Sequence, residues 1–251
     1  MRDLIQSLWI GPRLSTMERL CISSFLANGH PFQLYLYEDT DGIPPGTEVR
    51  DANRILPASR IFKYTGYDTY AGFANFFRYK MLLDRGGWWV DMDTVCLQPF
   101  EFSSPFVFSS ERGPTPDDPQ RVQQVNNGIL KAPAGSQPLE EAWRVCEEVA
   151  PQEMTWGQCG PALMARLVKQ HSLEPYVQAP EVFCPIDYPE WQEQLNPAAR
   201  WSFGPETRAV HLWNELWRRA GLDKDAMWDE SCLYEELKQR YLEFKKTSAT
   251  W

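Results

Sequence analysis

The sequence lacks the features that mark membrane-spanning, secreted and zinc-binding proteins. It has no run of the roughly 18 apolar residues that a bilayer-spanning helix needs, and the apolar stretch at its start is too short for a signal peptide. Its six cysteines form no CxxC pair and no tight cluster, which argues against a zinc site. Most of them lie in apolar runs, so we expect buried free thiols and a reducing compartment. These absences favour a cytoplasmic protein; peripheral membrane contact and a role as a secreted effector stay open.

Basic residues and histidine are also scarce. There are 25 Lys and Arg against 34 Asp and Glu, which gives a net charge of −9, and only three His. We therefore expect no broad nucleic-acid surface. An acidic chain that binds a phosphorylated ligand needs a local positive centre, either an Arg/Lys cluster or a bound cation. With 251 residues, 43% of them apolar, the chain can bury a real core, and we predict a single domain over residues 1–251.

The order of patterns along the chain predicts an α/β fold. Residues 4–10 and 33–37 are apolar strand candidates, and a capping box starts a helix between them at about residue 15. This β-α-β opening predicts a mainly parallel sheet flanked by helices. Residues 40–70 and 113–120 are expected to be mainly loop. The other expected elements are helices over 73–85, 136–149, 160–171 and 229–246, and strands over 88–90, 105–109, 125–132, 181–186 and 208–213.

The segment Asp91-Met92-Asp93 carries the clearest chemical signal. It follows the short apolar strand Trp88-Trp89-Val90, and ligands of open α/β sheets bind beyond the carboxyl ends of strands. Side chains at i and i+2 of an extended segment point the same way, so the two carboxylates repel unless a cation or a proton lies between them. Oxygen ligands suit Mg²⁺ or Mn²⁺. We predict Asp93 as a direct metal ligand and Asp91 as a ribose or water-mediated metal contact; the plain alternative is two acids at a strand end.

The helix before this strand adds two polar candidates. Asn75 and Arg78 are one turn apart and so share a face, and Gly86-Gly87 ends the helix. The planar guanidinium of Arg78 suits a donor sugar or phosphate, and the alternative is a structural salt bridge to an Asp. Asn75 would bind sugar hydroxyls, unless it is an ordinary solvated residue.

The whole block over residues 73–93 resembles DXD-motif glycosyltransferases. It is similar to the family 32-like enzymes of the capsular-polysaccharide and α-mannosyl or α-galactosyl transferase type, and more distantly to clostridial glucosylating toxins. Residues 8–11, 126–128, 157–161 and 209–214 also look like segments of this family. The resemblance implies a GT-A fold, with a donor half over about 1–110 and an acceptor half over about 111–251. It also implies a bacterial-type enzyme of polysaccharide biosynthesis that transfers a hexose or N-acetylhexosamine, with retention, from a nucleotide sugar that is expected to be UDP-linked.

The resemblance assigns further binding roles near the two ends of the chain. Trp9 and Ile10 would lie against the donor base, although a core tryptophan is an equal reading. His211 would ligate the metal or touch the diphosphate, with Asn214 assisting, and the alternative is a satisfied core histidine. The implied cofactor is Mn²⁺ or Mg²⁺.

Two more residues are candidates for the reacting centre. Asn127 and Gln158 would face the anomeric carbon or the acceptor, unless they are ordinary polar groups of a strand and a turn. The family has Ser-Asp where this chain has Ala74-Asn75. Asn is uncharged and donates as well as accepts, so the donor sugar stays open. The acceptor is also open and could be a glycan, a lipid-linked sugar, a small molecule or a protein.

Two other functions fit parts of the pattern. Residues 90–95 also match the DxDx(T/V) signature of haloacid-dehalogenase-like phosphohydrolases, in which Asp91 would be the nucleophile and Asp93 a general acid/base. That nucleophile normally follows the first strand, whereas about 90 residues precede Asp91 here. The other alternative is a non-catalytic nucleotide-sugar-binding protein.

Overall fold

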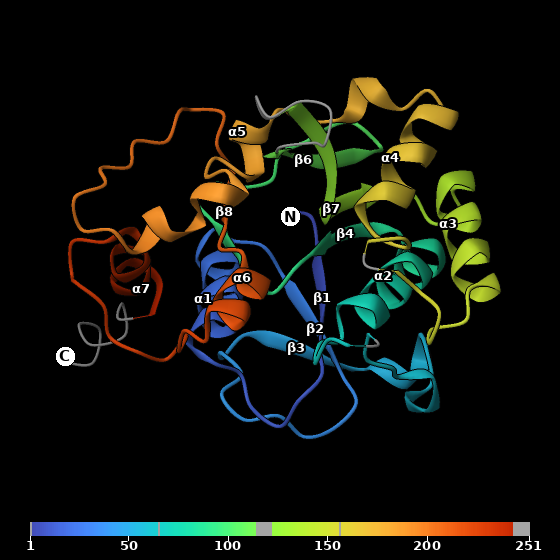
Figure 1. The fold of residues 1–251 in the computed structure, drawn as a ribbon, viewed down its shortest axis with the longest axis horizontal. Helices are drawn as coiled ribbons and strands as arrows, with labels where there is room; N and C mark the ends of the chain where they lie inside the picture. Colours follow the sequence, from blue (N-terminus) through green and yellow to red (C-terminus); the bar gives the residue numbers. More distant parts are fainter. Residues whose placement is uncertain (1, 65, 114–121, 156, 243–251) are drawn as a thin grey trace.

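A six-stranded, mostly parallel sheet forms the centre of the computed structural model, which describes residues 2–64, 66–113, 122–155 and 157–242 (Figure 1). Its strands are β1 (Ile5–Trp9), β2 (Phe32–Leu36), β3 (Thr47–Asp51), β4 (Gly87–Val90), β6 (Val107–Gly113) and β7 (Val122–Ala132). They are arranged in the order β3-β2-β1-β4-β7-β6. The pairs β3–β2, β2–β1 and β1–β4 are parallel, and β7 runs antiparallel to β4 and β6. A separate two-stranded sheet pairs β5 (Thr94–Cys96) with β8 (Ala209–His211).

Helices cover both faces of the central sheet (Figure 1). They are α1 (Thr16–Ala27), α2 (Ala71–Arg85), α3 (Gln137–Glu148), α4 (Pro161–Gln170), α5 (Pro180–Phe183), α6 (Asn214–Ala220) and α7 (Leu233–Leu242). Short 3₁₀ turns occupy Ala52–Arg54, Ala58–Arg60, Glu174–Tyr176 and Tyr188–Leu195. The predicted α/β class is confirmed. Within the described segments, no helix is long and apolar enough to cross a bilayer.

Two hydrophobic cores fix the position of β4. Trp88 and Trp89 are both buried and, as neighbours on a strand, point to opposite faces. Trp88 packs in the core with Phe25 of α1, and Trp89 packs in the core with Phe77 of α2. Because both faces of β4 pack against a hydrophobic core, the strand has a fixed position. Asp91, the residue that follows it, is therefore held at the carboxyl end of the strand. The six cysteines are buried free thiols, as predicted.

The predicted start of α1 is confirmed in detail. Ser15 caps the helix, accepting a hydrogen bond from the amide of Met17, and Glu18 accepts one from the amide of Ser15 at 2.7 Å. This reciprocal pair satisfies two amides that would otherwise lack partners at a helix start.

The strand predicted over residues 181–186 is wrong. Pro180 stands in the first turn of α5, where its missing amide hydrogen costs nothing, and Glu181 favours the positive end of the helix dipole. The apolar run reflects burial in the core that Phe183 shares with Phe100 and not sheet pairing.

Other differences from the sequence prediction concern short or polar elements. The stretch over 40–70 contains β3, an edge strand that is almost fully exposed. Its sequence is mostly polar and lacks the alternation of apolar and polar residues that predicts a strand. β5 and α6 are additional, and the last helix begins at Leu233, after a loop. Most of the predicted loop 113–120 lies outside the described residues.

A pH-dependent stability is expected from His30. Its Nε2 accepts the amide hydrogen of Phe100 at 2.9 Å, so its Nδ1 carries the proton and donates to the carbonyl of Asp3 at 2.8 Å. Burial lowers the pKa of His30 below its ordinary value of 6.5. The unfolded chain therefore takes up the proton first as the pH falls through 6.5, and the free energy of unfolding should decrease there.

Urea denaturation at about pH 7.5 and about pH 5.5 checks this expectation. His30→Gln keeps a donor and an acceptor but does not titrate, so it should lose less stability between the two pH values than the wild type. Equal losses in both proteins would contradict the assignment.

Candidate active site

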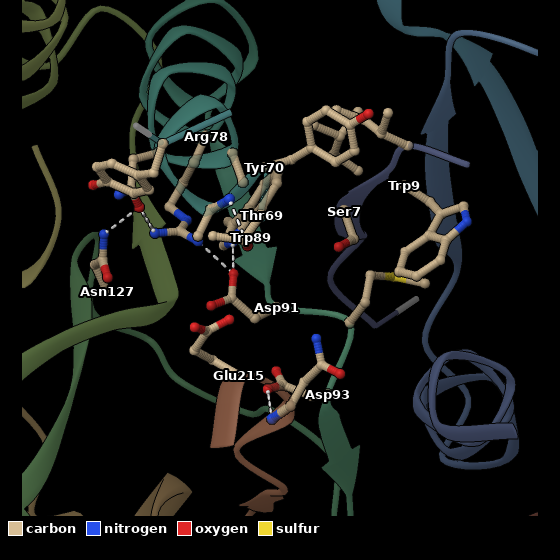
Figure 2. A pocket seen from close by; sticks show the side chains of 18 of the residues that line it. Ser7, Trp9, Thr69, Tyr70, Arg78, Trp89, Asp91, Asp93, Asn127 and Glu215 are labelled. Atoms are coloured by element: carbon tan, nitrogen blue, oxygen red, sulfur yellow. Dashed lines mark hydrogen bonds and ion pairs between the residues drawn. The ribbon is translucent and has the colours of Figure 1, made fainter. Parts of the chain in front are cut away.

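A cavity of about 410 Å³ opens beyond the carboxyl ends of β1 and β4, between α2 and α6. Most of the residues proposed from the sequence line it: Trp9, Ile10, Asn75, Arg78, Asp91, Asp93, Asn127 and Asn214. Figure 2 shows Trp9 on one side of it, Arg78 and Asn127 on the other, and the two aspartates between them. Side chains from five separate segments of the chain thus meet beyond the carboxyl ends of the central strands.

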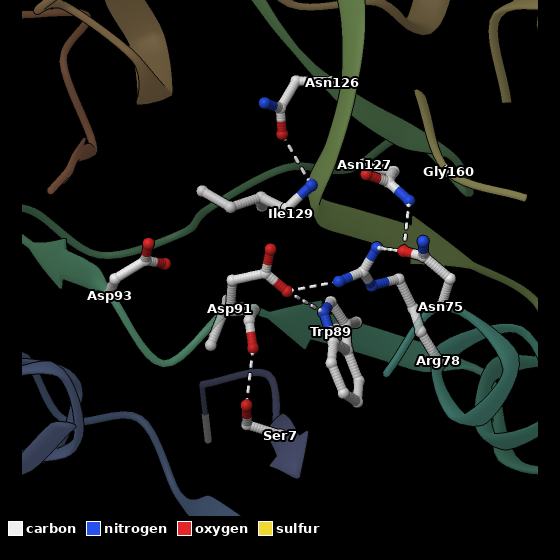
Figure 3. A network of polar contacts seen from close by, with 12 residues as sticks. Ser7, Asn75, Arg78, Trp89, Asp91, Asp93, Asn126, Asn127, Ile129 and Gly160 are labelled. Carbon is white, nitrogen blue, oxygen red and sulfur yellow. Dashed lines mark hydrogen bonds and ion pairs between the residues drawn. The ribbon is translucent and has the colours of Figure 1, made fainter. Parts of the chain in front are cut away.

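Asp91 is held in place by two side chains from the same region (Figure 3). Its Oδ1 accepts hydrogen bonds from the guanidinium of Arg78 and, at 2.8 Å, from the indole Nε1 of Trp89. Its amide donates to the carbonyl of Gly128 at 2.7 Å. Since Arg78 lies over the Trp89 ring, 5.0 Å from its centroid, the carboxylate, cation and ring form one packed unit.

Arg78 is connected further to a buried amide pair. Its Nη1 donates to Oδ1 of Asn75 at 2.7 Å, and the same oxygen accepts Nδ2 of Asn127 at 2.9 Å. Nδ2 of Asn127 also donates to the hydroxyl of Tyr79 at 3.1 Å. The side-chain oxygen of Asn75 is therefore used within the protein. The ion pair of Arg78 with Asp91 is the structural salt bridge that was the alternative interpretation for Arg78. Its Nε has no hydrogen-bond partner among the described residues.

Asp93 is held by the C-terminal part of the chain. Its Oδ1 lies 3.1 Å from Nε2 of His211, and its Oδ2 accepts the amide hydrogen of Asn214 at 2.8 Å. Trp213 directs that amide, because it adopts the left-handed conformation at φ 61°, which is unfavourable for a side chain with a Cβ. Its indole donates to the carbonyl of Ile186 at 3.1 Å and packs on the His211 ring, and these contacts offset the strain.

The two aspartates differ in charge behaviour. Burial raises the pKa of Asp91, against the opposing charge of Arg78. Burial also disfavours the ionised form of Asp93, but the charge of His211 and the donated hydrogen bonds lower the pKa of Asp93 below its usual range. Although burial favours neutral imidazole, the Asp93 carboxylate raises the pKa of His211. These directions favour an ion pair between Asp93 and His211, so His211 must give up its proton before its nitrogen can bind a cation.

Asp91, Asp93 and His211 can together offer three ligand atoms to one cation. One oxygen from each carboxylate and one imidazole nitrogen all lie within 4.8 Å of one another. Carboxylates suit Mg²⁺ and Mn²⁺, and imidazole is accepted more readily by transition metals. The donor set therefore fits a divalent cation, and it suits Mn²⁺ better than Mg²⁺. Each aspartate also has a basic partner within the protein, Arg78 for Asp91 and His211 for Asp93.

Two candidates from the sequence do not line the cavity. One is His211, which instead contacts Asp93, and the other is Gln158. Gln158 is exposed, and its Oε1 accepts hydrogen bonds from the amide and hydroxyl of Thr155 at 3.1 and 3.2 Å. It does not line the cavity, although the neighbouring Gly157 does. A catalytic role for Gln158 stays a prediction that this placement does not favour.

The sequence reading missed several residues of the site. Trp89 could have been found, because it precedes Asp91 by two positions on a strand and so points the same way. Glu215 follows the candidate Asn214 directly and also lines the cavity. Tyr64 and Tyr70 add aromatic surface from the segment before α2. That segment has no periodic sequence pattern from which its position could be predicted.

A tight contact at Gly128 predicts a sharp functional effect. An alanine Cβ there would lie 3.1 Å from Oδ2 of Asp91 and 2.9 Å from Oδ1 of Asn126, closer than packed atoms normally approach. Gly128→Ala should therefore displace the Asp91 carboxylate and lower the turnover of a donor substrate about 10- to 100-fold. Gly204→Ala is the matched control, since nothing lies within 4 Å of its Cβ position. Equal turnover in the two variants would contradict the expected displacement.

Comparison with known families agrees with this geometry. Residues 20–110 match the family model described as "Glycosyltransferase sugar-binding region containing DXD motif", which includes α2, β4 and both aspartates. The prediction of a glycosyltransferase enzyme is confirmed at this level, and the family 32-like assignment stays a prediction. The match argues against the phosphohydrolase alternative, as does the position of Asp91 after β4 and not after β1. No curated protein matches the chain.

Solved structures with a similar fold include two transferases. The structure entitled "PaToxG Glycosyltransferase" is 13% identical with a TM-score of 0.50, and the alignment covers 96% of this chain and 86% of that one. A transferase studied as a double Cys-to-Ser mutant is 12% identical with a TM-score of 0.40, covering 68% of this chain and 85% of that one. The first similarity supports the GT-A fold, and the second is too low to add to it.

Proposed function

We propose that the protein transfers a hexose or N-acetylhexosamine from a UDP-linked donor to an acceptor hydroxyl, with retention of configuration and with a divalent cation at Asp91, Asp93 and His211. The observation that carries this proposal is the convergence of these three side chains beside the cavity that Asp91, Asp93 and Arg78 line. A divalent cation bound there would neutralise negative charge on the departing nucleoside diphosphate.

Arg78 and its partners would prepare this site rather than react. The guanidinium holds the Asp91 carboxylate at the cavity wall and adds positive charge beside the leaving group. Asn75 and Asn127 fix the guanidinium in turn. Because the oxygen of Asn75 is occupied, its amide nitrogen would be the group that faces a sugar hydroxyl, as a hydrogen-bond donor.

Trp9 would provide the stacking surface for the donor base. It is partly exposed, lines the cavity and lies at the end of β1, across the cavity from Arg78 (Figure 2). A flat apolar face with a polar edge suits a nucleobase. Its indole Nε1 donates to the carbonyl of Arg13 at 3.1 Å, which leaves the ring face for the ligand.

Metal-dependent donor binding tests this function. At a nucleotide-sugar concentration of about 100 times its Kd, mass action should stabilise the fold by about 2.7 kcal/mol. Thermal unfolding with UDP-hexoses and UDP-N-acetylhexosamines should show this shift with Mn²⁺ and lose most of it in EDTA. Release of UDP from the donor then measures turnover.

Three other outcomes would contradict the proposal. If none of the nucleotide sugars stabilises the protein, the assignment of the donor is wrong. Binding without turnover across a broad set of acceptors and water would favour a non-catalytic sugar-nucleotide-binding protein. Turnover of p-nitrophenyl phosphate that depends on Asp91 would favour the phosphohydrolase.

A further inference from the structure

The indole of Trp9 is held from outside the cavity by a lysine of the C-terminal region. The ammonium of Lys224 lies over the Trp9 ring, 5.6 Å from its centroid. Trp9 lines the cavity, whereas Lys224 does not. The lysine is therefore positioned to restrain the ring without occupying the space that a ligand would fill.

A buried carboxylate fixes the position of Lys224. Its ammonium forms an ion pair with Oε1 of Glu18, whose side chain is only 1% exposed. The other oxygen of Glu18 accepts the amide hydrogen of Ser15 at 2.7 Å. Glu18 also lines the cavity, so this ion pair lies directly behind the ligand-facing surface. Removing its cation would leave a buried negative charge without an ionic partner.

The backbone around Lys224 is anchored independently. The carbonyl of Lys224 accepts the hydroxyl of Tyr234 at 2.8 Å. The next residue, Asp225, accepts both the amide and the hydroxyl hydrogen of Thr16 at 2.7 Å. The loop between α6 and α7 is thus fastened to the start of α1 and to α7, and it can hold a side chain in a defined place.

We propose that Lys224 is a positioning residue for the donor nucleoside: Glu18 holds it, it acts through Trp9, and it touches no ligand atom. This inference rests on the proposed function, because it assumes that a nucleobase stacks on Trp9. It adds to the donor site the loop between α6 and α7, which lies beyond the family match over residues 20–110. A ring restrained before binding costs less ordering when the ligand arrives.

Calorimetric binding at one fixed free Mn²⁺ concentration tests the role of Lys224. Lys224→Met keeps the aliphatic stem and removes the charge. It should weaken UDP binding about threefold to tenfold, the range of a cation–π contact with its ion pair. Inorganic pyrophosphate has no base, so its Kd should stay within about twofold of the wild-type value. Lys224→Arg should restore most of the UDP affinity.

A double-mutant cycle separates positioning from a general effect on the fold. In the Trp9→Ala background, Lys224→Met should cause no further loss of UDP affinity, because the lysine acts through the missing ring. The matched control is Lys238→Met: Lys238 also pairs with a glutamate and lies 5.1 Å from a ring centroid, that of Tyr234. It should leave UDP affinity unchanged.

Three results would overturn the inference. One is unchanged UDP affinity in Lys224→Met, and another is equal weakening of UDP and pyrophosphate. The third is a full additional loss in the Trp9→Ala background. These failures leave wild-type binding of UDP intact. If the wild type binds neither UDP nor pyrophosphate, the proposed function itself fails and the inference with it.

Discussion

Asp93→Ala is expected to lower donor turnover about 10³-fold, corresponding to several kcal/mol of barrier. Asp93 supplies a carboxylate of the proposed cation site and is held by His211 and the amide of Asn214. The substitution removes a charge that stabilises the leaving group through the cation. Release of UDP from the donor, measured at saturating Mn²⁺, gives the comparison.

Two further variants make the Asp93 result interpretable. Asp93→Asn keeps the shape of the side chain and one acceptor for Asn214 but removes the charge, so it should be almost as inactive as Asp93→Ala. Asp84→Ala removes a carboxylate near the C-terminal end of α2, where Asp84 pairs with Lys80. This variant should retain turnover within about twofold. Turnover of Asp93→Ala within tenfold of the wild type would be incompatible with a metal-ligand role.

The largest effect on stability is expected at Arg78. Its side chain is 3% exposed and ion-paired with Asp91. Arg78→Met removes the cation. Asp91 then keeps only the Trp89 indole as a side-chain donor, and the oxygen of Asn75 keeps only Asn127. Arg78 is buried but the Asp91 side chain is 30% exposed, so the free energy of unfolding should fall by about 2 to 3 kcal/mol, less than for two fully buried charges, as measured by urea denaturation.

Lys80→Met provides a control on the same helix. Lys80 also pairs with an aspartate, Asp84, and also lies near a tryptophan ring, but the pair is partly exposed. Its removal should cost less than about 0.5 kcal/mol. Asp91→Asn combined with Arg78→Met should be less destabilising than the sum of the single variants. Similar losses for Arg78→Met and Lys80→Met would show that the pair with Asp91 contributes no more than a surface contact.

Local chemistry made the centre of the site predictable. Trp88 and Trp89 point into different cores. A strand that is buried on both faces in this way can be recognised in the sequence as a continuous apolar run. The extended segment expected over residues 91–93 is instead a turn, closed by the amide of Thr94 donating to the carbonyl of Asp91 at 3.1 Å. The two carboxylates therefore converge through this turn and not through strand alternation. For Arg78, spacing placed the side chain on the correct helix face, but its partner depended on the three-dimensional approach of Asp91.

The remainder depends on contacts that local patterns do not encode. β3 is polar and exists because β2 offers it an edge. The apolar run around Phe183 is buried but does not pair with a strand. The turn that carries Gln158 bonds to itself through Thr155, so its amide never reaches the cavity. For β3 and for the run around Phe183, tertiary packing decides the outcome, whereas the placement of Gln158 follows from a local turn that the sequence analysis did not foresee.

The small sheet of β5 and β8 has a consequence for how the enzyme is made. Thr94 pairs with His211 across it, and this pairing brings His211 to Asp93 over a separation of 118 residues. A nascent chain that has emerged only as far as β7 already contains both aspartates but lacks their histidine and the turn at Trp213. The proposed cation site is therefore incomplete until the chain has been synthesised past Trp213.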